Sequence, residues 1–204
     1  MGFLKGRENT VRLLTSVGIF GALGGIINGL LCFLRIPPVA EGSGYFDWRI
    51  VPAAMCHGSL LAVCSVGFSV LFLKKKELFR WIVIPAVGWI SSWISFIPFH
   101  LYITKNLQAV VLWPMQLAPQ AWYVPFCYFG LVAILAYFFL GICRLLLSKD
   151  WRIHVAAGVF SGVVGSLWWW SAWKPWFVSI LHGSIWGILV GFSVGRFIRM
   201  KGGI

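Results

Sequence analysis

Long apolar stretches alternate along the chain with short segments that carry most of its charged residues. A helix that crosses a bilayer needs about 20 consecutive, mostly apolar residues, and several stretches reach this length. The pattern therefore predicts an all-α integral membrane protein in which residues 1–204 form a single transmembrane domain. Six spanning helices are expected, at about residues 13–34, 50–73, 81–104, 123–143, 153–173 and 177–195.

The charged residues predict how these helices are oriented. The formal net charge is +12, and 13 of the 17 Lys and Arg residues lie in the four segments that would share one side of the membrane, residues 1–12, 74–80, 144–152 and 196–204. Cytoplasmic segments are enriched in Lys and Arg, so we expect both termini in the cytoplasm and the chain in the cytoplasmic (inner) membrane. Because this topology accounts for the basic residues, nucleic acid is not an expected partner.

Two sequence patterns occur twice in the chain. His57-Gly58-Ser59 and His182-Gly183-Ser184 are each followed by a Gly-Phe-Ser-Val sequence, and the pattern Arg-x5-Gly-x-Phe-x4-Gly begins at Arg12 and again at Arg152. Both patterns run in the same direction in each copy. The hairpin of the first two spans is therefore predicted to be repeated as the hairpin of the last two. His57 and His182 are then expected at equivalent depths in the membrane.

The polar residues inside the predicted spans are the candidates for function. No Asp, Glu, Lys or Arg lies in the middle of a span, which argues against an ion-coupled transporter or proton pump. His57, His100, His182 and Asn28 remain, together with two tryptophans, Trp169 and Trp186. These six residues are the predicted ligand-binding set.

Three interpretations of the histidines stay open. Each imidazole could hydrogen-bond a neighbouring helix, or the imidazoles and indoles could line a pocket for an organic solute that enters from outside. The third interpretation is ligation of heme b or a metal ion, with His57 and His182 as ligands of one iron, since neutral imidazole is a common metal ligand. No cofactor is required by the sequence, and no metal-ligand cluster is predicted. The motifs of hydrolases, metalloproteases and phosphate-binding loops are missing, so the protein is not expected to be an enzyme.

Small residues at helical spacing mark a packing face in the first span, which includes Gly18, Ala22 and Gly25. In lipid such faces let helix backbones approach closely, either within the chain or against a partner subunit. The segment from Val11 to Leu23 resembles the first helix of the substrate-binding S-components of energy-coupling-factor vitamin transporters. The resemblance implies capture of a vitamin or metal on the outer side, with Gly18 and Ala22 in the face that docks the coupling subunit.

These observations together predict a membrane-embedded solute-binding component of a transporter. Its pocket would face outward, would be lined by Trp and His, and would lie among membrane lipid and other membrane subunits. The alternative is a heme-binding or structural accessory subunit of a larger membrane protein complex.

Overall fold

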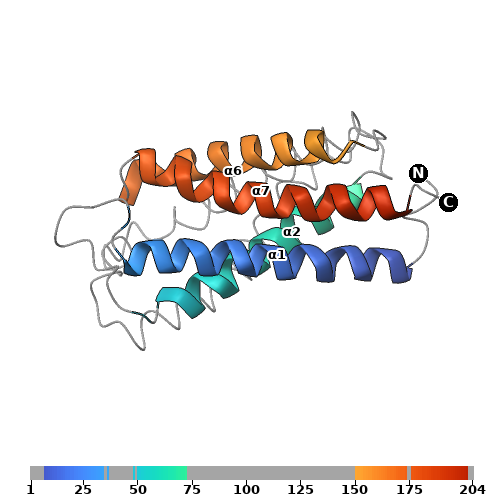
Figure 1. The fold of residues 1–204 in the computed structure, drawn as a ribbon, viewed down its shortest axis with the longest axis horizontal. Helices are drawn as coiled ribbons and strands as arrows, with labels where there is room; N and C mark the ends of the chain where they lie inside the picture. The colour runs from blue at the N-terminus through green and yellow to red at the C-terminus, as the bar shows by residue number, and fades with distance from the viewer. Residues whose placement is uncertain are drawn as a thin grey trace, which may run out of the picture.

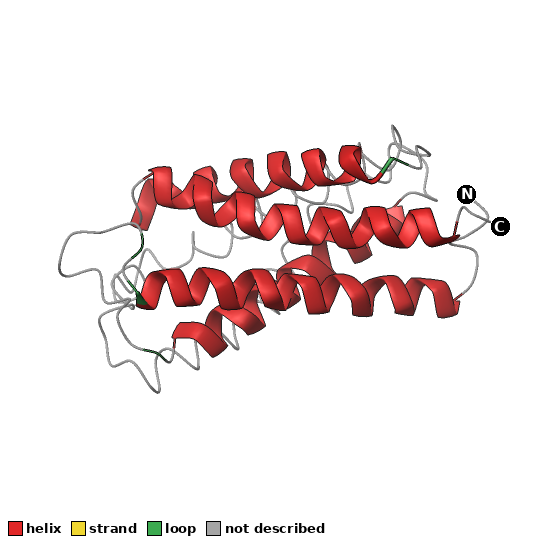
Figure 2. Cartoon of the chain, viewed as in Figure 1, coloured by secondary structure: helices red, strands yellow, loops and turns green. Residues whose placement is uncertain are grey.

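This computed structural model describes residues 7–34, 36, 48, 50–72, 150–173 and 176–201. Within these residues the chain forms four α-helices and no strand: α1 (Arg7–Phe33), α2 (Ile50–Phe72), α6 (Trp151–Trp173) and α7 (Trp176–Lys201) (Figures 1 and 2). The all-α class is thereby confirmed for this part of the chain. Four of the predicted spans coincide with these helices, although α1 begins six residues before its span and α7 ends six residues after its own. The spans predicted at 81–104 and 123–143 lie outside the described residues.

The helix starts follow from local chemistry. Asp150 precedes α6, and its carboxylate accepts the backbone N–H of Arg152 at 3.0 Å, which satisfies one of the donors that a helix leaves open at its first turn. In α1 the first turn contains Glu8, which pairs with Arg12 one turn later. Pro52 lies in the first turn of α2, where a missing backbone N–H costs no helical hydrogen bond.

The helices are arranged in the order α6, α7, α1, α2 across the molecule (Figure 1). Contacts join α6 to α7, α7 to α1 and α1 to α2, so the two sequence-adjacent hairpins meet through α1 and α7. The residues of the apolar core come from α1, α2 and α7 and include Val17, Ala62 and Val190, each fully buried.

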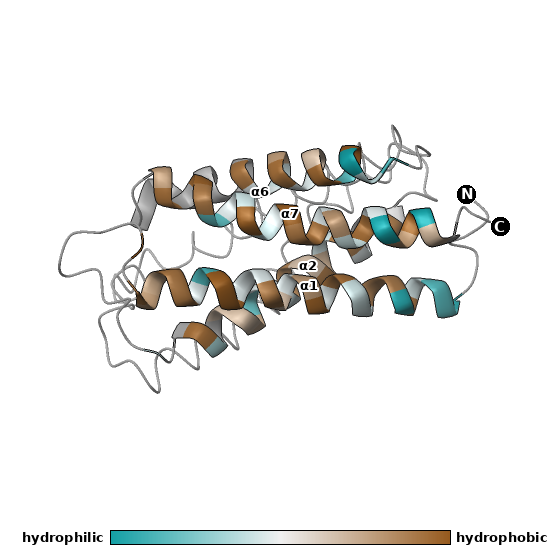
Figure 3. Cartoon of the chain, viewed as in Figure 1, coloured by the Kyte–Doolittle hydropathy of each residue, from teal (hydrophilic) through white to brown (hydrophobic). Residues whose placement is uncertain are grey.

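One end of the bundle carries all the charged side chains that the structure describes. The hydroxyls of Ser16 and Ser193 hydrogen-bond at 2.8 Å, so the start of α1 lies level with the end of α7. Gly195 contacts the backbone of Trp151, which places the start of α6 at the same level. Figure 3 shows the hydrophilic residues gathered there. We call this the charged end; its described cations are Arg7, Arg12, Arg152, Arg196 and Arg199.

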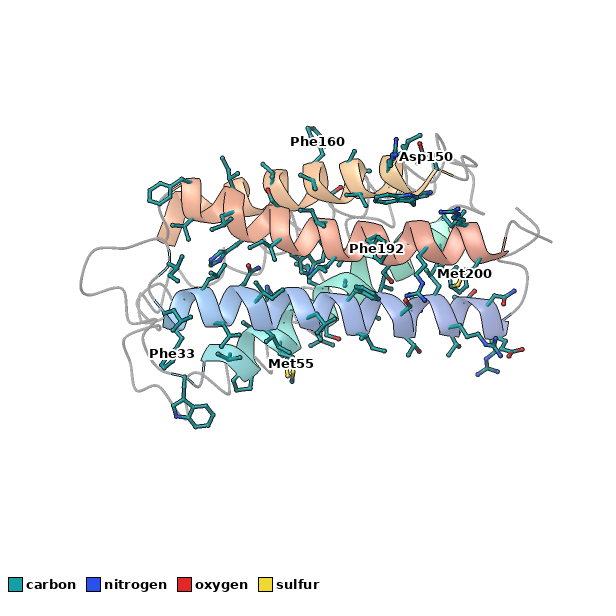
Figure 4. The ribbon with its side chains drawn as sticks, in the orientation of Figure 1. Phe33, Met55, Asp150, Phe160, Phe192 and Met200 are labelled. Carbon is teal, nitrogen blue, oxygen red and sulfur yellow. The ribbon has the colours of Figure 1, made fainter. Side chains whose placement is uncertain are left out.

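The exterior of the bundle is apolar while much of the interior is small or polar. Large side chains such as Ile19, Leu23 and Phe160 are 43–56% exposed, and Phe160 points away from the bundle (Figure 4). Buried positions include His154, His182 and Ser193. Two described segments, Arg7–Phe33 and Ile180–Met200, are long and apolar enough to cross a membrane, judged by length and composition.

Candidate functional site

Three helices meet at a point where glycines bring their backbones together. A Cβ atom at Gly21 would lie 2.5 Å from the carbonyl oxygen of Gly58, and one at Gly25 would collide with the backbone at Ala54. Only glycine permits this approach of α1 to α2, because the space of the side chain is filled by backbone atoms. Helix α7 reaches the same point through Gly24, where an added Cβ would lie 3.1 Å from Cα of Trp186.

Trp186 connects α7 to α2 across α1. Its side chain is 5% exposed, and its indole N–H donates to the carbonyl oxygen of Gly58 at 3.1 Å. A buried indole needs an acceptor for its N–H, and a helical carbonyl keeps a second lone pair after its own helical bond. The missing side chain of Gly58 serves the contact with α1 instead, since a Cβ there would collide with the carbonyl oxygen of Gly21.

Asn28 forms the second polar contact at this point, between α1 and α7. Its Nδ2 donates to the backbone carbonyl of His182 at 3.0 Å. Its Oδ1 is buried and has no hydrogen-bond partner among the described residues. The Asn28 side chain thus binds α7 through its NH2 group and leaves its carbonyl oxygen as a buried acceptor. We call Gly24, Asn28, Gly58, His182 and Trp186 the three-helix junction.

The two histidines of the repeated motif lie on different helices of the junction. His182 is buried on α7, beside the carbonyl that Asn28 contacts, and His57 is half-buried on α2, next to Gly58. Gly58 packs between Gly21 and Gly25, whereas His182 lies level with Asn28. Along α1, the two histidines are therefore offset by about one helical turn, and their equal depth in a membrane stays a prediction.

Four of the six predicted ligand-binding residues are thus brought to or beside the junction: Asn28, His57, His182 and Trp186. His100 lies outside the described residues, and so does the side chain of Trp169, which belongs to α6. That any of the six binds a solute or heme stays a prediction.

The small-residue face predicted for α1 packs against α2 within the chain. Gly18 and Gly25 are buried, with Val63 and Ser59 near the first and Ala54 near the second, and Ala22 is half-buried. This is the intramolecular alternative that the spacing left open. Docking of a partner subunit at Gly18, Ala22 and Gly25 stays a prediction.

Sequence reasoning missed two features of the α6–α7 hairpin. His154 is 1% exposed on α6, although it is the second residue of the span predicted at 153–173 and does not belong to the predicted ligand-binding set. Gly183, Gly187, Gly191 and Gly195 form a stripe at intervals of four residues on α7. That spacing alone marks one helix face and would have identified the stripe.

Among the described residues no group of three or more His, Cys, Asp or Glu side chains gathers in a way that could hold a metal ion. Comparison of the chain with protein-family models, with curated proteins and with solved structures finds no match. The resemblance of the first helix to the vitamin-transporter S-components therefore stays a prediction.

Proposed function

We propose that the chain is an integral membrane protein and that its three-helix junction binds a small polar solute, as the non-catalytic binding component of a transporter. The observation that carries this proposal is the buried acceptor Asn28 Oδ1, held in place by the amide's own bond to α7. The solute would need a hydrogen-bond donor to match it.

Membrane insertion is supported by where the apolar and polar residues lie. Large apolar side chains cover the outside of α1 and α7, and the polar contacts are turned inward between helices. In water this distribution would leave a large apolar surface exposed, whereas in lipid it is favourable. Two segments of spanning length agree with this proposal.

The outward position of the site follows from the charged end. If that end lies in the cytoplasm, as the enrichment of arginine favours, Asn28 lies 16 residues beyond Arg12. At a rise of about 1.5 Å per residue this is about 24 Å, well past the middle of a hydrocarbon core about 30 Å thick. The junction would then face the outer leaflet.

The same proposal includes six spans and a duplicated hairpin. Its support is the repeated motif together with the packing of the glycine that follows each histidine. Gly58 packs against Gly21, and the backbone of Gly183 packs against Gly162.

A structural subunit of a larger membrane complex is the second candidate, and a specific observation favours it. The amide nitrogen of Asn28, the indole nitrogen of Trp186 and the hydroxyls of Ser16 and Ser193 are all engaged in contacts between helices. Polar side chains with these partners need no ligand to be stable in lipid.

A ligand screen by thermal unfolding of the purified protein separates the two candidates, with Asn28→Ala as the test variant. Ser16→Ala is the matched control, because Ser16 also bonds α7 but lies 12 residues away along α1. Solute binding predicts that a compound with hydrogen-bond donors raises the melting temperature of the wild type and of Ser16→Ala. Its affinity for Asn28→Ala should be at least about tenfold lower, the loss expected when one buried hydrogen bond is removed.

Equal affinity in the two variants would place the binding site away from the junction. If no compound raises the melting temperature and mass spectrometry finds no copurifying small molecule, the structural-subunit candidate replaces solute binding.

A further inference from the structure

A row of aromatic rings crosses one face of the bundle from α1 to α6. The ring centroids of Phe20 and Phe192 are 5.9 Å apart, and those of Phe192 and Trp151 are 6.0 Å apart in an edge-to-face arrangement. Phe192 and Trp151 are each 36% exposed. The row therefore presents an aromatic surface to the surroundings of the protein. Phe192 of α7 is its central ring (Figure 4).

Three arginines follow this row at the charged end, one each from α1, α6 and α7. Arg196 lies four residues beyond Phe192, and Arg12 lies eight residues before Phe20 on the same α1 face as Ser16. Side chains spaced by four residues share a helix face, so both arginines continue the aromatic face toward the charged end. Arg152 follows Trp151 directly, as Arg196 follows Gly195, and Gly195 packs against the backbone of Trp151, so the two arginines extend from neighbouring turns of α6 and α7.

The acidic side chains described at this end already have partners. Glu8 pairs with Arg12, and the carboxylate of Asp150 accepts the backbone N–H of Arg152. Both are exposed, and so are all three arginines. Of the described charges at this face, arginine remains in excess, next to an exposed apolar surface.

We propose that this arginine–aromatic face, formed by Arg12, Phe20, Trp151, Arg152, Phe192 and Arg196, binds an anionic phospholipid. Guanidinium groups hydrogen-bond phosphate oxygens in a planar fork, tryptophan is favoured at the boundary between head groups and acyl chains, and the two phenylalanine rings offer apolar contact to the chains. A soluble anion would use only the arginines, whereas a phospholipid also covers the rings. The proposal rests on membrane insertion but not on solute binding at the junction.

Lipid binding is tested by measuring the affinity of the purified detergent-solubilised protein for phosphatidylglycerol, with phosphatidylcholine as the neutral reference. We expect preferential binding of phosphatidylglycerol, and about fivefold weaker binding in Arg196→Gln, which is the effect of one basic residue at an anionic surface. Arg7→Gln is the matched control, since it removes the same charge at the same end but lies five residues from Arg12, on another face of α1. Its affinity should stay within about twofold of the wild type.

Equal weakening in Arg196→Gln and Arg7→Gln would overturn the proposal in favour of a diffuse effect of surface charge. The absence of any preference for phosphatidylglycerol in the wild type would also overturn it. Arg196→Lys keeps the charge and serves if Arg196→Gln does not fold; it should bind more weakly than the wild type if the guanidinium fork contacts phosphate. Solute affinity at the junction should be unchanged in all three variants, so failure of this proposal is separate from failure of the proposed function.

Discussion

Counted from the histidine of each His-Gly-Ser motif, the α1–α2 and α6–α7 hairpins place different residues at the same four positions of their second helices. In α7 these positions are Gly183, Gly187, Gly191 and Gly195, and in α2 they are Gly58, Ala62, Val66 and Val70. The first position is identical, and α2 then has alanine followed by two valines toward the charged end, where α7 keeps glycine.

The packing follows this difference in size. Backbone contacts between α6 and α7 recur at four successive turns, from Gly162 with Gly183 to Trp151 with Gly195. Among the described glycines of α1 and α2, those that meet the backbone of the other helix are Gly21, Gly25 and Gly58. Figure 1 accordingly shows α6 running beside α7, whereas α2 crosses α1 obliquely.

The wider side chains of α2 have a second consequence. Ala62, Val66 and Val70 are 0–6% exposed and belong to the apolar core together with Val190 and Val194 of α7. Glycine at these positions lets the two helices of a hairpin pack backbone to backbone, which we call the closed hairpin. Alanine and valine hold α1 and α2 further apart, which we call the open hairpin, and α7 packs into the core that they form. Similar motifs thus give one tight pair of helices and one open pair.

The largest effect is expected from adding a methyl group to the closed hairpin. A Cβ at Gly187 would lie 2.5 Å from the carbonyl carbon of Gly158 and 2.8 Å from the nitrogen of Val159, so Gly187→Ala must push the helices apart. We expect a loss of about 2–3 kcal/mol in the free energy of unfolding, measured by denaturant titration in detergent.

Gly67→Ala is the matched control in the open hairpin. Among the described residues, a Cβ there would meet the side chain of Leu14 alone, at 3.5 Å, which is an ordinary contact. Because alanine is a better helix former than glycine, this variant should be as stable as the wild type or more stable by up to about 1 kcal/mol. Comparable destabilisation of both variants would refute the proposed contrast between the hairpins.

A smaller effect is expected where the closed hairpin contacts the open one. Trp186→Phe keeps a buried aromatic ring but removes the N–H that donates to Gly58. Hydrogen bonds between helices in lipid contribute about 1 kcal/mol, and we expect a loss of this size in the same titration. Trp151→Phe, at an exposed tryptophan, should change stability by less than about 0.5 kcal/mol. A loss in Trp151→Phe as large as that in Trp186→Phe would mean that the hydrogen bond to Gly58 makes no contribution of its own to the free energy of unfolding.

The helices and their polarity could be predicted from the sequence because they depend on neighbouring residues. The segment expected to be helical at 50–73 is α2 at Ile50–Phe72. Arg12, Arg152 and Arg196, which the sequence predicted on one side, all lie at the charged end of the bundle. Length, apolar composition and the placement of basic residues are local properties, and a helix in lipid satisfies its own backbone.

The contacts between helices could not be predicted in the same way. The bond from Trp186 to Gly58 joins residues 128 positions apart, and it depends on how far α2 diverges from α1. The offset of His57 from His182 has the same origin, since a shared motif fixes the neighbours of each histidine but not the packing of its helix. Asn28 was predicted as a polar residue inside a span, whereas its partner is a backbone carbonyl that no sequence pattern distinguishes.

The central claim is that α1 and α7 join the two hairpins in the membrane, and cysteine cross-linking tests it most directly. The hydroxyl oxygens of Ser16 and Ser193 are 2.8 Å apart, so cysteines at both positions have their Cβ atoms within reach of a disulfide. With the five native cysteines replaced by alanine, Ser16→Cys/Ser193→Cys should cross-link readily in isolated membranes under mild oxidation. Thr15→Cys/Ser193→Cys, with Thr15 on the exposed side of α1, should not. Equal yields from the two pairs, or no cross-link in the first, would contradict the arrangement.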